Sequence, residues 1–279
     1  QTPILDARLE GGERVNVVMA PVALNGPALT IRKFPEKPVT MEILTAWDSI
    51  TPEAADFLKN LVRARYTIFV GGGTSTGKTT FLNALSRFIP EDERIVTIED
   101  TAELQLQGTE NLVRLEVRPE TLQGGKEIGI RQLIRTALRM RPGRIIIGEV
   151  RGAEAADFLN CLNTGHEGSL GSAHANSIRD MIGRLETMAL MGRQMSEQVI
   201  RRQIAAGIEI LVHLERDSSG RRRVQEIGEV TGIRQGEVQV QPLYRRNRQQ
   251  VLEPSGCLER REKLEKWQEE ENGKGKNPI

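Results

Sequence analysis

The segment GGGTSTGKTT, residues 71–80, constrains the fold of this 279-residue chain more than any other feature. It contains Gly72, four residues, and then Gly77, Lys78 and Thr79, which is the G-x-x-x-x-G-K-[ST] pattern of a phosphate-binding loop. The glycines allow backbone N–H groups to surround phosphate oxygens closely, and a helix that starts here points its N-terminus at the same anion. The apolar stretch YTIFV before the loop and the helical pattern TTFLNALSRFI after it favour this interpretation over a chance glycine-rich turn.

The loop predicts a site that takes ATP together with Mg²⁺. Lys78 is expected to neutralise the β- and γ-phosphates, and the Thr79 hydroxyl is expected to hold the metal ion. The predicted nucleotide-binding residues are Gly72, Gly73, Thr74, Ser75, Thr76, Gly77, Lys78, Thr79 and Thr80.

Short apolar strands alternate with helical patterns after the loop. RIVTI, NLVRLEV and RIIIG are typical of strands, and IRQLIRTALRM carries apolar residues at helical spacing. A further short strand is expected around GSLGSAHA, and Ser177, with Asp180 three residues later, predicts a capped helix start. This alternation indicates an α/β domain around a mostly parallel sheet. Small antiparallel strands are expected after residue 207.

The composition along the chain predicts four parts. Residues 1–35 read as short strands of a smaller N-terminal α+β domain, and residues 36–50, with prolines nearby, as a linker. The α/β domain then covers residues 51–252, with Thr51 and Pro52 opening its first helix. The charged residues 253–279 are expected to form a solvated helix or a disordered tail. Because the chain opens on Gln1, we expect the N-terminal domain to be incomplete.

Two predicted strands run into acidic residues. A phosphate loop needs further groups to orient water and to stabilise charge on the γ-phosphate, and in open α/β sheets these lie beyond the carboxyl ends of strands. RIVTI runs into Glu99 and Asp100, and RIIIG runs into Glu149. We predict that Glu149 polarises the attacking water or organises Mg²⁺, and that Glu99 is a second catalytic acid. Asp100 could equally cap the following turn.

Two of the three histidines, His166 and His174, lie in the polar stretch NTGHEGSLGSAHANS, residues 163–177. Zinc needs about four ligands, usually with cysteine or a third histidine nearby, so we expect no zinc site here. An inert polar loop is one alternative. The other is contact with phosphate or with Glu149, for which His174 is the stronger candidate. His213, within ILVHLE, is expected to be structural.

The composition argues against several classes of protein. A net charge of +1 and an aromatic content of 4% disfavour a nucleic-acid-binding surface. No apolar run approaches the roughly 20 residues of a membrane span. Cys161 and Cys257 form no metal-spaced pair, which favours a reducing, cytoplasmic setting.

Three ordered motifs beyond the phosphate loop closely resemble the secretion ATPases of the type II/type IV superfamily. The segment RIVTIEDTAELQL resembles the family's aspartate box, and LRMRPGRIIIGEVRGAEAADFLNCLNTGHEGSLGSAHANS resembles its Walker B segment followed by its histidine box. The resemblance covers about residues 4–245 and is strongest to the Tad/CpaF-type pilus-assembly branch and its conjugation-type relatives. The four-cysteine zinc module of other branches has no counterpart in this sequence.

The resemblance implies a RecA-like ATPase domain joined to a smaller N-terminal domain, assembled as a hexameric ring on the cytoplasmic face of the bacterial inner membrane. The implied partners are platform proteins of a secretion or pilus machine. The implied catalytic residues are Glu149, the Walker B acid, Glu99, and the histidine-box residues His166 and His174. N-terminal arginines of the family reach the phosphates, and Arg8 and Arg14 match them, with Arg32 a weaker candidate.

Other arginines and other functions stay open at this stage. Arg151, just after Glu149, is a candidate for the phosphates but could equally pair with a neighbouring acid. The run Arg221 to Arg223 follows a Ser-Ser-Gly turn and is expected to be a solvated hairpin tip. The alternatives to a secretion motor are a RecA-like nucleic-acid translocase and a nucleotide-gated module with negligible turnover.

Overall fold

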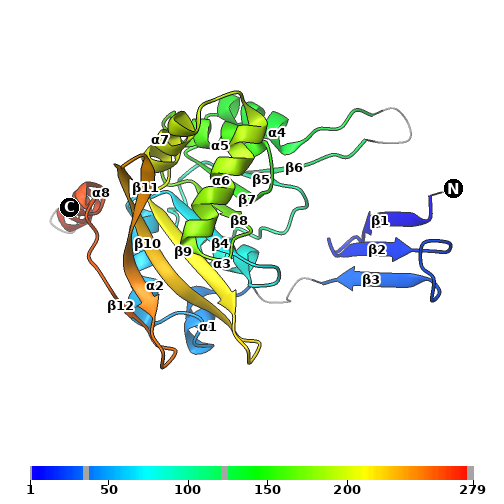
Figure 1. The fold of residues 1–279 in the computed structure, drawn as a ribbon, viewed down its shortest axis with the longest axis horizontal. Helices are drawn as coiled ribbons and strands as arrows, with labels where there is room; N and C mark the ends of the chain where they lie inside the picture. The colour runs from blue at the N-terminus through cyan, green and yellow to red at the C-terminus, as the bar shows by residue number, and fades with distance from the viewer. Residues whose placement is uncertain (1, 34–37, 121–124, 275–279) are drawn as a thin grey trace. The chain divides into compact units, whose positions relative to one another are not determined.

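The computed structural model describes residues 2–33, 38–120 and 125–274, which form two compact units, Gln1–Pro38 and Val39–Ile279. The smaller unit is a three-stranded antiparallel sheet in the order β1-β2-β3 (Figure 1). Its strands confirm the expected run of short strands. They are β1 Ile4–Arg8, β2 Arg14–Val18 and β3 Ala28–Arg32.

Within the described part of the larger unit, nine strands form one sheet in the order β12-β11-β10-β9-β4-β8-β7-β5-β6. The strands from β9 to β6 in this order pair in parallel, whereas β9 to β12 pair antiparallel. The antiparallel strands predicted after residue 207 therefore extend the parallel sheet. The strands are β4 Ile68–Gly72, β5 Ile95–Glu99, β6 Leu112–Glu116, β7 Arg144–Val150, β8 Leu170–Ala173, β9 Ile210–Arg216, β10 Arg222–Arg234, β11 Glu237–Arg246 and β12 Leu252–Pro254.

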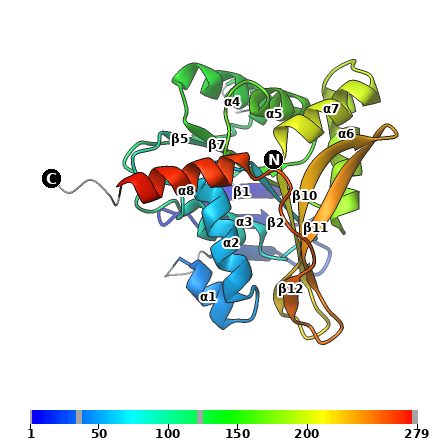
Figure 2. The ribbon, with the colours of Figure 1, turned by 90° about the vertical axis from the view of Figure 1, so that its left-hand side faces the viewer.

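Helices cover both faces of this sheet (Figure 2), and one hydrophobic cluster fills each interface. The strands β4, β5 and β7 carry apolar side chains on both faces, as expected of parallel strands covered on two sides. One face carries α1 Met41–Ala46, α2 Pro52–Arg63, α3 Lys78–Ser86 and α8 Glu262–Lys274. The other carries α4 Ile130–Ala137 with the 3₁₀ turn Leu138–Met140, α5 Glu154–Leu162, α6 Ile178–Gly192 and α7 Glu197–Gly207.

Local signals in the sequence set several helix ends. The Ser177 hydroxyl accepts a hydrogen bond from the Asp180 backbone N–H, which confirms the predicted cap of α6. Pro52 occupies the first turn of α2 as predicted, but the Thr51 side chain makes no capping bond. None of the helices in the described ranges is long and apolar enough to cross a membrane.

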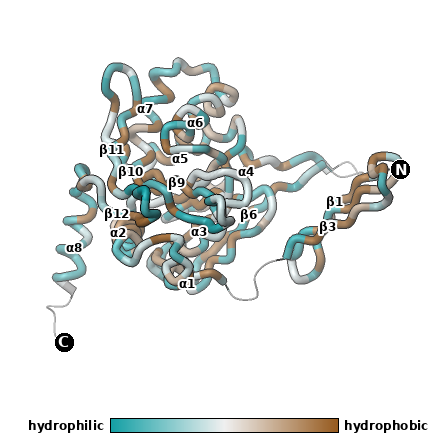
Figure 3. Tube along the Cα trace, turned by 60° about the horizontal axis from the view of Figure 1, so that its bottom comes forward, coloured by the Kyte–Doolittle hydropathy of each residue, from teal (hydrophilic) through white to brown (hydrophobic). Residues whose placement is uncertain are grey.

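Two predicted boundaries differ from the structure. Residues 36–37 of the expected linker lie outside the described residues, and residues 39–50 belong to the larger unit, because Met41 and Leu44 of α1 are buried in its core. The first part of the expected charged tail is also packed against the larger unit. β12 pairs with β11, and α8, although largely hydrophilic along its length (Figure 3), packs Leu264 and Trp267 against the core.

Candidate nucleotide-binding and catalytic site

The strand order brings the predicted site residues to one edge of the sheet. β4, β8, β7 and β5 are consecutive neighbours, and their carboxyl ends point to the same side. Ala173 of β8 pairs with Gly71 of β4 on one side and with Val150 of β7 on the other. The residues that follow these positions therefore lie next to one another: the phosphate loop after β4 and His174 after β8, beside Glu149 near the end of β7.

The phosphate loop has a backbone conformation that its sequence explains. Gly77, the residue before α3, has φ +94°, and Ser75 has φ +60°. This left-handed conformation favours glycine, which has no Cβ to clash, at position 77, whereas Ser75 adopts it with a side chain present. At Gly72, a Cβ would lie 2.6 Å from the Leu214 carbonyl oxygen, so the close pairing of β4 with β9 also requires glycine. The Thr76 hydroxyl closes the loop by donating to the Gly73 carbonyl at 2.9 Å.

Lys78 is folded back onto the loop. Its Nζ donates to the carbonyls of Gly72 and Gly73 at 3.1 Å each, and it lies 3.5 Å from Glu149 Oε1. The side chain is 9% exposed. Burial lowers the pKa of Lys78, an effect that the neighbouring Glu149 carboxylate opposes. The ammonium group is thus held close to the N-terminus of α3, where a phosphate binds in other proteins with this loop.

Glu149 stands at the centre of a charged cluster. Its Oε2 accepts from Arg151 Nε at 2.8 Å and from Arg151 Nη2 at 2.5 Å, and Arg151 Nη1 lies 2.9 Å from Asp100. Arg151 therefore pairs with the acids that end β7 and β5, which was one of the two alternatives for it. Glu149 Oε1 is buried and accepts no well-aligned hydrogen bond from the described residues, although two cations or donors lie nearby. It is an acceptor that a ligand can satisfy.

His174 lies between Lys78 and Glu149. Its Nε2 is 3.0 Å from Glu149 Oε1, and its Nδ1 is 3.5 Å from Lys78 Nζ. Burial, and then the positive charge of Lys78, lower the pKa of His174, so the ring is neutral at pH 7. A neutral ring donates from one nitrogen and accepts at the other, which suits a carboxylate on one side and an ammonium group on the other.

Glu99 lies at the end of β5 and is 3% exposed. Its Oε2 accepts from the backbone N–H groups of Glu103 and Leu104 at 2.7 Å each, which organises the turn after the strand. Burial raises the pKa of Glu99, and these backbone hydrogen bonds oppose the shift. Its Oε1 is buried without a hydrogen-bond partner in the described part of the chain. One oxygen thus has a structural task, and the other is open to a ligand or water.

His166 lies apart from this cluster. His166 precedes β8, whereas His174 follows β8. The two histidines therefore lie at opposite ends of this strand, whose four residues span about 13 Å. His166 Nδ1 contacts the Cys161 carbonyl at 3.2 Å. The resemblance placed both histidines in one histidine box. In this chain β8 separates them, and His174 is the one that contacts Glu149.

The predicted N-terminal arginines belong to the smaller unit. Arg8 pairs in register with Arg14 across β1 and β2, and Arg14 pairs with Arg32 across β2 and β3. The three positions therefore form one row across the sheet. His213, in the larger unit, is buried in β9, and burial lowers its pKa, in keeping with the structural role expected for it.

The prediction of a solvated tip for the hairpin between β9 and β10 is confirmed only in part. Arg222 donates from Nε to the Ser75 carbonyl of the phosphate loop at 2.9 Å, and Arg223 is 5% exposed. Arg223 pairs with Asp48 at 2.6 Å and with Asp217 at 3.5 Å. Arg221 and Arg222 are exposed, as predicted for a solvated tip, so the prediction is wrong only for the buried Arg223, although Arg222 also contacts the phosphate loop. Only the arginine content marked this segment in the sequence, since Asp48 and Ser75 lie far away along the chain, although Asp217 belongs to the same hairpin.

A phosphate loop on a central strand of a two-sided parallel sheet, with an acid two strands away, defines a RecA-like phosphate-loop protein. The chain matches the family model "Type II/IV secretion system protein" over residues 1–269 and belongs to that family.

Named relatives and solved structures agree with this assignment. A Mycobacterium tuberculosis protein, provisionally named a conjugal transfer protein, is 41% identical over 86% of this chain and 69% of its own length. The type IV secretion system protein VirB11 of Brucella suis is 35% identical over 78% of this chain and 69% of its own length. The crystal structure of that VirB11 ATPase superposes with a TM-score of 0.57, covering 81% of this chain and 76% of its own.

Proposed function

We propose that this protein is an ATP-hydrolysing motor of a bacterial secretion, conjugation or pilus-assembly machine, which works as a hexameric ring against inner-membrane platform proteins on the cytoplasmic face. The family and the VirB11 ATPase structure support the activity and the class of machine. The observation that carries the catalytic part is the cluster of Lys78, Glu149 and His174 beside the phosphate loop.

The residues of the loop fit a nucleotide with Mg²⁺. Thr79 is in the first turn of α3, and Glu149 Oε1 is a buried acceptor without an aligned donor. These two groups would hold the metal ion directly or through its water shell. When bound, Mg²⁺ would neutralise charge on the phosphate oxygens.

The protein's own groups supply the remaining steps. Lys78 exchanges its two carbonyl partners in the loop for phosphate oxygens. Glu149 orients the attacking water, and His174, in contact with both side chains, links the presence of the γ-phosphate to the position of the carboxylate. Arg151 holds the second oxygen of Glu149 and so fixes which oxygen faces the nucleotide.

A Glu149→Gln variant tests the catalytic assignment. We expect ATP binding to be retained and the rate of hydrolysis to fall at least about tenfold, because the amide cannot act as a base. Removal of Mg²⁺ with a chelator should abolish turnover in the unmodified protein. Unchanged turnover in Glu149→Gln would overturn the assignment, and negligible turnover before substitution would favour a nucleotide-gated module instead.

Addition of DNA separates the motor from a nucleic-acid translocase. We expect duplex and single-stranded DNA to change the ATPase rate less than twofold. A strong stimulation that weakens steeply with salt would instead favour a translocase.

A further inference from the structure

A cavity adjoins the phosphate loop. It has a volume of about 260 Å³ and lies within the larger unit. Thr76, Gly77 and Thr80, which belong to the predicted phosphate site, form one wall of it. Any ligand that places phosphates on the loop therefore has this cavity directly beside it. The other walls come from α1 and from the β9–β10 hairpin: Leu44, Trp47, Ser49, Phe81, Leu214, Gly220, Arg221 and Arg222.

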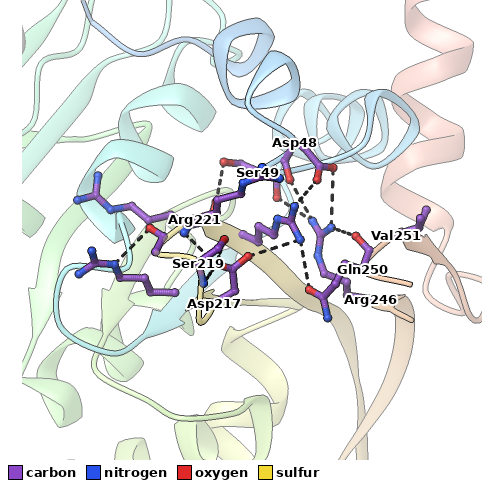
Figure 4. Close-up of polar contacts among 12 residues, drawn as sticks. Asp48, Ser49, Asp217, Ser219, Arg221, Arg246, Gln250 and Val251 are labelled. Atoms are coloured by element: carbon purple, nitrogen blue, oxygen red, sulfur yellow. Dashed lines mark hydrogen bonds and ion pairs between the residues drawn. The ribbon is translucent and has the colours of Figure 1, made fainter. Parts of the chain in front are cut away.

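A network of hydrogen bonds and ion pairs fixes the hairpin wall. The Ser49 hydroxyl donates to the Arg222 carbonyl at 2.7 Å, and the Arg222 guanidinium donates to the Ser75 carbonyl at 2.9 Å. Behind the wall, the buried Arg223 pairs with Asp48, and Arg246 donates to the Ser49 carbonyl at 3.2 Å (Figure 4). The segment after α1, the hairpin and the phosphate loop are thereby tied together, so the cavity is formed before a ligand enters.

The tip of the hairpin is also braced internally. The Asp217 carboxylate accepts from the Ser219 hydroxyl at 2.6 Å and from the backbone N–H groups of Ser219 and Arg221 at 2.9 Å each (Figure 4). An acidic residue that closes a turn in this way orders the loop that follows it. Arg221 and Arg222, at the rim of the cavity, are thus held by an ordered turn.

Trp47 is the feature of this cavity that points to a ligand. It is one of only two tryptophans in the sequence and is 59% exposed, although it lines a cavity with the apolar side chains Leu44, Phe81 and Leu214. A large exposed aromatic ring beside a phosphate-binding loop offers a surface for a planar base. The neighbouring guanidinium groups of Arg221 and Arg222 can stack on the same base or bond to the ribose hydroxyls.

We propose that this cavity takes the base and ribose of the nucleotide, with the base stacked on Trp47. The proposal rests on the proposed nucleotide-binding function of the phosphate loop. It further assigns a weak base preference to the protein. Among the described residues that line the cavity, none has an amide or carboxylate side chain, which are the groups that discriminate base edges most strongly. Stacking accepts either purine, so ATP and GTP should bind with dissociation constants within about threefold of each other.

Binding measurements with three probes test this assignment. Calorimetry with ATP, GTP and inorganic tripolyphosphate, each with Mg²⁺, is applied to the unmodified protein, to Trp47→Ala and to Trp47→Phe. Stacking of one base typically gives about 1–3 kcal/mol, or about 5- to 150-fold in affinity. Because Trp47 is more than half exposed, we expect Trp47→Ala to weaken ATP and GTP about tenfold and tripolyphosphate less than twofold. Trp47→Phe should keep most of the affinity.

A matched change at the second tryptophan serves as control. Trp267 lies on α8 and does not line the cavity, so Trp267→Phe should leave all three affinities unchanged. In that background Trp47 is the sole tryptophan, and its fluorescence should change on addition of ATP but not of tripolyphosphate.

The outcomes separate the two proposals. If neither ATP nor tripolyphosphate binds the unmodified protein, the proposed function itself fails. If both bind but Trp47→Ala binds ATP as tightly as before, the base lies elsewhere and the assignment of the cavity is overturned. A GTP affinity more than tenfold below that of ATP would overturn the weak base preference.

Discussion

His174 and His166 should differ sharply in their effect on ATP hydrolysis, although only seven residues separate them in one polar stretch. His174 lies 3.0 Å from Glu149 Oε1 and 3.5 Å from Lys78 Nζ. His166 contacts the Cys161 carbonyl at the opposite edge of the sheet. We predict that His174→Ala lowers kcat and that His166→Ala leaves it within about threefold of the unmodified protein.

The expected size of the His174 effect follows from its contacts. A hydrogen bond to a charged group typically contributes about 1.5–3 kcal/mol. The ring of His174 is 39% exposed, so water competes for its nitrogens, and its 3.0 Å contact with Glu149 Oε1 is not a well-aligned hydrogen bond, so the lower end of this range is the most that the contact can contribute. About 1.5 kcal/mol corresponds to roughly a tenfold change in rate, because a factor of ten is about 1.36 kcal/mol. His174→Asn, whose amide both donates and accepts, should lose only about threefold.

Steady-state ATPase measurements at saturating Mg²⁺ provide the assay, with kcat and KM determined separately. Since His174 is proposed to respond to the γ-phosphate, affinity for ADP should be unchanged in His174→Ala. Equal losses of kcat in His174→Ala and His166→Ala would refute the reasoning, because they would show that the distance from Glu149 does not matter. A change in thermal stability of either variant, measured by calorimetry, identifies any loss due to folding.

Two further predictions concern buried charges away from the nucleotide. Glu93→Gln removes the carboxylate partner of the fully buried Arg144. We therefore expect the free energy of unfolding to fall by about 3 kcal/mol, which corresponds to a decrease of roughly 6–12 °C in Tm for a unit of this size. Burial by itself raises the pKa of Glu93, but the hydrogen bonds and positive charges of Arg144 and Arg65 together outweigh burial, so the pKa is lowered. The stabilisation is therefore present above the ordinary value of 4.5 and is lost as pH falls through the lowered value. The difference in Tm between protein and variant should shrink on acidification, and a difference that grew would contradict this account. Asp157→Asn weakens the ion pairs to Arg131 and Arg193, whose side chains are about 40% exposed. The free energy of unfolding measured by urea denaturation should fall by about 1–2 kcal/mol. An unchanged free energy of unfolding would mean that solvent already screens these pairs.

Much of the fold could be predicted because its signals are local. The phosphate loop, the strand before it and the helix after it are consecutive in the sequence, as are Ser177 and Asp180 at the start of α6. Apolar spacing placed α4 correctly because Ile130, Leu133 and Ile134 face the core. Such features depend on the residues within a few turns or one strand, which the sequence contains in full.

The arrangement of the site depended instead on the order of strands in the sheet. The chain visits β4, β5, β7 and β8 in that order, but in space β8 lies between β4 and β7. Because β8 lies between β4 and β7, His174 at its carboxyl end lies between the phosphate loop and Glu149. His166 lies beyond the amino end of β8. The sequence of residues 163–177 favoured His174 over His166 for contact with Glu149, but it did not show that the two rings lie at opposite ends of β8. The two histidines differ in their distance from Glu149 because β8 runs parallel to β4 and β7, so only the residue after β8 lies at the carboxyl ends of these strands.

The hairpin between β9 and β10 shows why the burial of Arg223 could not be predicted from the composition. A run of three arginines after a Ser-Ser-Gly turn is usually solvated, since a guanidinium group is costly to bury without a partner. Here the partners come from distant segments: Asp48 is 175 residues from Arg223, and Ser75 is 147 residues from Arg222. Asp48 and Asp217 supply the carboxylates that a buried guanidinium group needs. The ion pair of Arg223 with Asp48 also ties the segment that contains Trp47, one residue before Asp48, to the hairpin that lines the cavity beside the phosphate loop.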